Sequence, residues 1–153
     1  MFHPTANKGI ITSGYLPPHR PDHYGIDIAA AEGTPVYAWK SGKVEIAVKG
    51  CTNGDFACGL KGGNYVQIRH DSQTKSQYLH LQSNVVSKGQ RVKEGQLIGY
   101  MGKTGYSFGT HLHFAILVNG KFINPTPYLK TTSKKKSQNN LMNFLPLLFL
   151  LDI

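Results

Sequence analysis

Hydrophobic and polar residues alternate over short segments along most of this chain, and glycine-containing turns separate the segments. The clearest faces with a period of two are Val66 with Ile68, and the even-numbered positions of 112–118. This period is typical of strands, whereas an amphipathic helix repeats every 3.6 residues. The pattern predicts six strands, over residues 34–38, 43–48, 64–70, 75–81, 96–101 and 111–118.

Turn signals between these segments predict how the strands are connected. Ser41-Gly42, Gly62-Gly63-Asn64 and Asn119-Gly120 combine residue types that tolerate tight turns. Two glycine-bracketed stretches, 33–44 and 89–99, also resemble each other, which indicates a weak internal duplication. We therefore expect a mostly β fold with little helix, either an antiparallel β-sandwich or a flattened barrel.

The composition changes abruptly after Leu129. Residues 130–140 form a polar, lysine-rich linker, and residues 141–153 form a short apolar tail. A chain of 153 residues suffices for one ordinary domain, which we place at 10–129 after a short lead at 1–9. The tail is too short to cross a bilayer as a helix. It either makes a weak contact with a membrane or a partner, or it has no selected structure.

The chain is basic, with 17 Lys and Arg against 8 Asp and Glu and a net charge of +9. This surplus favours polyanions such as nucleic acid, anionic lipid or the phosphate-rich polymers of a bacterial wall. The cations are scattered, with neither a basic helix nor the aromatic stacking motif of an RNA-binding sheet, so we expect no nucleic-acid partner. The pattern also predicts no membrane-spanning helix and no Sec-type signal.

The candidate chemistry lies in four of the seven histidines. His111 and His113 stand two residues apart in a predicted strand, so their imidazoles share one face. His23 and Asp27 stand four residues apart across a glycine and can converge in a strand or over a bend. His80 stands between two leucines, which we expect on the opposite face. Each motif is weak alone, but together they supply the three ligands and the unligated groups that a zinc hydrolase needs.

At these residues the sequence resembles the lysostaphin-type zinc endopeptidases, also called LytM-like or glycyl-glycine endopeptidases. The resemblance covers about residues 10–129. It is carried in the family's order by HYGIDIAA (23–30), GTPVY (33–37), YLHL (78–81), VKEGQLIG (92–99) and GTHLHF (109–114). It implies a β fold of the duplicated hybrid type with a long open groove.

The resemblance also implies a role for each site residue. It places one Zn²⁺ per chain on His23, Asp27 and His113, and it makes His80 and His111 the catalytic pair. Which of these two imidazoles is the general base stays open. The chain has no H-E-x-x-H helix with a glutamate base, which agrees with proton transfer by imidazoles.

The activity implied is hydrolysis of peptide bonds in peptidoglycan stems or cross-bridges. The alternative is a relative that binds the wall or activates another hydrolase without cutting, and retention of all five site residues favours the enzyme. A lipoyl- or biotinyl-type carrier is a weaker alternative, because the chain lacks a lysine between methionines at a hairpin tip.

The expected partners are peptidoglycan peptides, with anionic wall polymers and phage tail or other virion proteins as further candidates. We expect the chain to act in the bacterial wall or periplasm. It would arrive there as a phage endolysin, as part of a virion, or by excision from a larger secreted chain.

Cys51 and Cys58 are the only cysteines, and they bracket a loop longer than a turn between two strands needs. Their spacing favours a disulfide, which would persist outside the reducing cytosol. Two free thiols and a metal clip are the alternatives.

Overall fold

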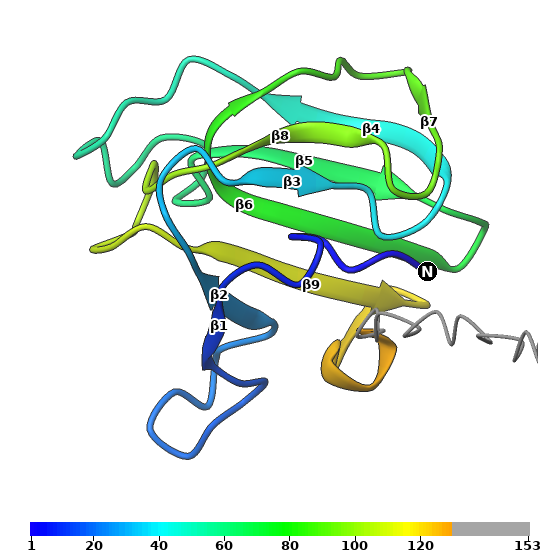
Figure 1. The fold of residues 1–153 in the computed structure, drawn as a ribbon. Coiled ribbons are helices and arrows are strands. Elements are labelled where there is room, and N and C mark those ends of the chain that lie inside the picture. The colour runs from blue at the N-terminus through cyan, green and yellow to red at the C-terminus, as the bar shows by residue number, and fades with distance from the viewer. Residues whose placement is uncertain (130–153) are drawn as a thin grey trace, which may run out of the picture.

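The computed structural model describes residues 1–129, which form ten antiparallel strands in one branched sheet (Figure 1). The 3-10 turn η1 (Thr126–Tyr128) is the only helical element among these residues. The strands are β1 (Ile10–Ser13), β2 (Ile26–Ala29), β3 (Pro35–Tyr37), β4 (Gly42–Val48), β5 (Asn64–Arg69), β6 (Thr74–Asn84), β7 (Arg91–Val92), β8 (Leu97–Met101), β9 (Leu112–Val118) and β10 (Lys121–Ile123). The predicted mostly β, antiparallel fold is confirmed. The predicted linker at 130–140 and tail at 141–153 lie outside the described residues.

The long strand β6 connects the two layers of the molecule. It pairs with β9 as far as Leu79 and with β8 from Leu81 onward. The change of partner falls on His80, whose φ is +63°. β8 in turn pairs with β3, and this pair lies over the main sheet, whose strand order is β1-β2-β9-β6-β5-β4-β7 (Figure 1). The result is a sandwich built from one sheet.

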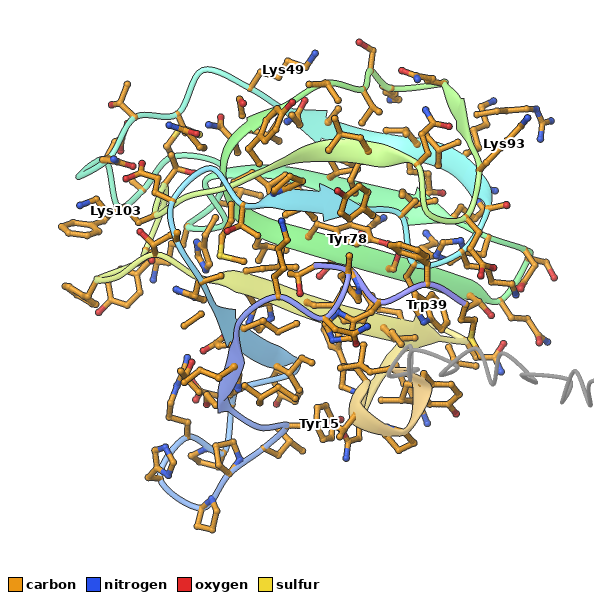
Figure 2. All side chains as sticks on the ribbon, in the orientation of Figure 1. Tyr15, Trp39, Lys49, Tyr78, Lys93 and Lys103 are labelled. Atoms are coloured by element: carbon orange, nitrogen blue, oxygen red, sulfur yellow. A yellow bond between two sulfur atoms is a disulfide. The ribbon has the colours of Figure 1, made fainter. Side chains whose placement is uncertain are left out.

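The core lies between these two layers. Tyr78 is completely buried, and its hydroxyl accepts a hydrogen bond from the backbone N–H of Trp39 at 2.8 Å. Burial raises the pKa of Tyr78, so the phenol stays neutral. Figure 2 shows both residues inside the molecule, whereas Lys49, Lys93 and Lys103 project from its periphery. Further core side chains are Val36, Ile98 and Met101 from the smaller layer, and Val44, Val66, Ile68, Phe114 and Ile116 from the main sheet.

All six predicted strands are present, with small shifts at their ends. The alternation does not predict β1, β2, β7 and β10. β2 has the sequence Ile-Asp-Ile-Ala, and four residues are too few to establish a period of two. β7 and β10 have only two and three residues, too few for a period to be visible.

The disulfide predicted between Cys51 and Cys58 is present, and it closes the loop between β4 and β5. The lead at 1–9 packs against the domain, since the backbone N–H of Phe2 donates to the carbonyl of Trp39 at 2.7 Å. Within residues 1–129, no helix has the length and apolar character needed to cross a membrane.

Candidate metal centre

Two neighbouring strands carry two of the predicted metal ligands. Asp27 in β2 lies directly opposite His113 in β9, so both side chains leave the same face of the sheet. His23 stands four residues before Asp27, and the chain bends between them at Gly25. A Cβ atom on Gly25 would lie 2.6 Å from Nε2 of His113. Glycine is therefore required for the backbone to pass this close to the ring.

The three side chains converge on one point. Nε2 of His23 lies 2.9 Å from Oδ1 of Asp27 and 3.1 Å from Nδ1 of His113. The same Oδ1 lies 2.9 Å from Nδ1 of His113. Ligand atoms about 2.0–2.1 Å from a tetrahedral zinc ion lie roughly 3.3 Å apart. Two imidazole nitrogens and one carboxylate oxygen at this spacing therefore fit zinc, and the group could hold a metal ion.

Hydrogen bonds from outside the group orient two of these side chains. Nδ1 of His23 lies 2.6 Å from the carbonyl of Gly14. Because a carbonyl only accepts, Nδ1 carries the proton and Nε2 keeps its lone pair for the metal. Nη1 of Arg20 donates to Oδ2 of Asp27 at 2.9 Å, which leaves Oδ1 facing the histidines.

Arg20 is a site residue that the sequence pattern does not single out. It stands in the loop 16–22, where prolines and mixed polar residues form no motif. Its only signal is a cation placed seven residues before a candidate carboxylate ligand. In the structure its guanidinium donates hydrogen bonds to both Asp27 and the hydroxyl of Ser13, and so holds the carboxylate in place.

His80 and His111 stand beside the metal group. Their ring centroids are 4.8 Å apart, and the His80 ring lies 6.3 Å from that of His113. Nδ1 of His80 lies 2.8 Å from the carbonyl of Thr104, and Nδ1 of His111 lies 2.8 Å from that of Gly109. Each carbonyl fixes the proton on Nδ1 and leaves Nε2 free to accept another. The structure thus brings all five predicted residues together.

The position of His80 depends on an uncommon backbone conformation. Its φ of +63° lies in the left-handed region, which non-glycine residues rarely occupy outside functional sites and turns. The period of two breaks here. Leu79 pairs opposite His113 and lines the groove, whereas Leu81 is fully buried in the core. The prediction that both leucines lie opposite His80 is therefore wrong for Leu79.

The surroundings favour neutral imidazoles and an ionised carboxylate. Burial first, and then the charge of His111, lower the pKa of His80 to about 4. Burial also lowers the pKa of His113. Burial would raise the pKa of Asp27, but hydrogen bonds from His113 and Arg20 outweigh it and hold this pKa well below its usual range. These are the protonation states that bind a metal ion.

A groove runs from the site across the face of the main sheet. Its first part is a pocket of about 360 Å³ whose lining includes all four residues His80, His111, Tyr106 and Phe108. It continues past Leu79 onto a depression over β4, β5 and β6. The floor of that depression carries Ile46, Tyr65, Gln67 and Gln77. This shape agrees with the long open groove that the resemblance implies.

Comparison with known proteins places this site in a family. The sequence profile of peptidase family M23 matches residues 21–125, which include all five predicted site residues. Peptidoglycan DD-endopeptidase ShyC of Vibrio cholerae is 45% identical over 103 residues, which make up 67% of this chain and 22% of that protein. The chain spans 22% to 33% of the length of the curated relatives it matches.

Solved structures are similar as well. The catalytic domain of lysostaphin from Staphylococcus simulans has a TM-score of 0.62 at 35% identity, covering 80% of this chain and 90% of that one. A zinc-containing peptidase from Vibrio cholerae has a TM-score of 0.63 at 37% identity, covering 80% of this chain and 36% of that one. On the profile match, the sequence identity and the shared fold, this chain belongs to peptidase family M23.

Proposed function

We propose that this chain hydrolyses peptide bonds in peptidoglycan stems or cross-bridges, with one zinc ion held by His23, Asp27 and His113. The observation that carries the proposal is the convergence of three ligand atoms within 3.1 Å of one another, beside two further imidazoles in an open groove. Two relatives support it by name, one as a peptidoglycan DD-endopeptidase and one as a zinc-containing peptidase.

The residues divide the work of hydrolysis. Zinc, when bound, polarises a carbonyl group and acidifies water. His80 and His111 handle the protons: an Nε2 atom accepts a proton from the attacking water, and an imidazole returns one to the leaving amine. Their Nδ1 atoms stay hydrogen-bonded to carbonyls, which keeps both rings in place during the transfer. The groove holds the peptide in an extended form across the sheet.

We place the activity in a peptidoglycan wall. The disulfide between Cys51 and Cys58 supports a compartment outside the reducing cytosol. Delivery by a phage or from a larger secreted chain stays a prediction, as do contacts with virion proteins and anionic wall polymers.

Digestion of purified sacculi tests the proposed function. The zinc-loaded chain is incubated with sacculi of several cross-link types, with and without a chelator, and mass spectrometry identifies the new peptide ends. We expect new amino and carboxyl ends at one bond type, and their loss with chelator and in His111→Ala. Binding to sacculi without new ends would instead identify a non-catalytic, wall-binding relative.

A further inference from the structure

Three aromatic side chains crowd together at the surface near the metal group. The ring centroids of Phe56, Tyr106 and Phe108, which we call the aromatic trio, are 5.3, 5.4 and 5.9 Å apart. Their exposed fractions are 43%, 56% and 80%. Rings this exposed bury little area and contribute little to the stability of the fold. A cluster of exposed apolar side chains is typical of a binding surface.

The three rings of the trio come from two loops, and these loops are bonded to each other. Phe56 stands in the loop that the Cys51–Cys58 disulfide closes, and the other two rings stand between β8 and β9. A β-bridge joins Asn53 of the first loop to Thr104 of the second. Figure 1 shows both loops at the same end of the molecule.

Hydrogen bonds, two of them buried, reinforce this connection. The side chain of Asn64 accepts from the backbone N–H of Cys51 at 2.8 Å, and its own backbone N–H donates to the hydroxyl of Thr104 at 3.0 Å. The backbone N–H of Tyr106 donates to the carbonyl of Lys61 at 2.8 Å. The two loops therefore hold the rings in place before any ligand arrives, which lowers the entropy lost on binding.

The trio is continuous with the candidate active site. Tyr106 and Phe108 line the same pocket as His80 and His111. A molecule that occupies this pocket therefore contacts Tyr106 and Phe108, and Phe56 lies beside these two rings. An extended peptide spans about 3.3–3.6 Å per residue, so a group a few residues from the bond in the pocket can reach these rings.

We infer that the aromatic trio is a stacking platform for the N-acetylated pyranose rings of the glycan strand that carries the peptide to be cut. This inference rests on the proposed function, because it takes peptidoglycan as the substrate. Peptidoglycan consists of sugar rings and short peptides with mostly small or charged side chains. Only the sugar rings offer flat surfaces that match three clustered aromatic rings.

The chemistry of stacking supports this occupant. The C–H bonds on a pyranose face are polarised by neighbouring oxygens and carry partial positive charge. The face of an aromatic ring carries partial negative charge, so the two faces attract each other and shed water together. Thr52, Asn53 and Asp55 are exposed polar residues of the same loop as Phe56, and their side chains can hydrogen-bond hydroxyl and acetamido groups.

Binding of a peptide-free sugar tests the platform without requiring hydrolysis. NMR titration of the chain with tetra-N-acetylchitotetraose should show saturable shifts in residues 51–61 and 104–110. Phe108→Ala and Phe108→Leu should weaken binding at least about fivefold, since each aromatic contact contributes a factor of this order. Phe108→Tyr, which keeps the ring, should bind as the wild type does.

A second measurement compares intact sacculi with a sugar-free cross-linked peptide. In Phe56→Ala and in Phe108→Ala, the hydrolysis rate on sacculi divided by the rate on the sugar-free peptide should fall at least about fivefold. Ile10→Ala truncates a non-aromatic apolar side chain that is 69% exposed on β1, and it should leave this ratio unchanged.

The outcomes separate the two proposals. If the wild type cuts neither substrate but binds chitotetraose through the trio, the proposed hydrolysis fails and the platform stands. If the wild type cuts sacculi but binds no chitotetraose, or if Phe108→Leu binds it as well as the wild type, the platform is overturned. An unchanged ratio of rates in both alanine variants would overturn it as well.

Discussion

Asp27 and His113 are directly opposed residues of β2 and β9, and Oδ1 of the first lies 2.9 Å from Nδ1 of the second. Neither the aspartate nor the histidine needs a loop to reach the other, because pairing of the two strands sets their distance. A site built on paired strands is held more rigidly than one built on loops. The relative position of these two proposed metal ligands is therefore fixed by the hydrogen bonds of the sheet.

Loss of a ligand and loss of an unligated imidazole should have different effects. His113→Ala and Asp27→Ala remove one of three ligands, so we expect the zinc content of the folded protein to fall from about one per chain to near zero. His80→Ala should keep its zinc and lose about 10²- to 10⁴-fold in turnover, the usual contribution of a general acid or base. Elemental analysis and rates on sacculi measure the two effects. Full zinc content in His113→Ala would contradict the ligand assignment.

Gly25→Ala should weaken metal binding through its neighbour. The added Cβ would lie 2.6 Å from Nε2 of His113 and 2.7 Å from the carbonyl of Phe114, so the ring must leave its present position opposite Asp27. We expect the zinc affinity to fall about 10- to 100-fold, the usual effect of disturbing a ligand's orientation. Competition with a chromophoric chelator measures this affinity.

Gly14→Ala is the matched control for that variant. A Cβ on Gly14 would meet no atom within 4 Å, and the substitution keeps the carbonyl that His23 uses. Its zinc affinity should equal that of the wild type. If Gly14→Ala and Gly25→Ala lost the same zinc affinity, the close approach of Gly25 to His113 would not be the cause of the loss.

His70 should make the stability of the fold depend on pH. Its Nδ1 donates to the carbonyl of Ser41 at 2.9 Å, and its Nε2 lies 2.8 Å from Oγ of Ser76. Burial is the main cause that lowers the pKa of His70. The unfolded chain, with a histidine pKa near 6.5, therefore takes up the proton more readily than the folded chain.

The free energy of unfolding should accordingly be highest above about pH 6.5 and fall as the pH drops toward the lowered pKa of His70. His70→Gln can keep both hydrogen bonds but does not titrate, so its stability should fall less steeply. Urea denaturation between about pH 7.5 and 5, with chelator present, gives both profiles. The pKa values of His3, His80 and His113 are lowered as well, so the informative quantity is the difference between variant and wild type. Parallel profiles would contradict the prediction.

Asn64→Ala should destabilise the domain. The Asn64 side chain is buried, accepts from the N–H of Cys51, and donates to the carbonyls of Cys51, Leu81 and Gln82. Alanine leaves these buried groups without their partner, which costs about 2–3 kcal/mol. Urea denaturation at neutral pH measures the loss. A change below about 0.5 kcal/mol, the usual range for surface substitutions, would contradict this role.

Local patterns account for the parts of the fold that have a period. The alternation over 112–118 and at Val66 and Ile68 predicts β9 and β5 correctly, since one face of each strand is buried. Strand β2 escapes prediction because it has only four residues, too few for a period of two to be recognised. The break at His80 escapes prediction too, because its left-handed backbone is stabilised by contacts from Gly62 and Gly102, which are distant in the sequence.

By itself, the sequence predicted the β class of the domain, proposed the five candidate site residues and favoured a disulfide between the two cysteines. Residue type and short-range spacing indicate these features, and the roles of the five residues are what the resemblance to the lysostaphin-type family implies. Only the tertiary structure decided that Arg20 holds the carboxylate of Asp27, that Leu79 faces the groove, and that Phe56 meets Tyr106 and Phe108. These relationships depend on which strands pair and where two loops are joined, and strand pairing is the free-energy result of the whole sheet rather than a property of any one segment.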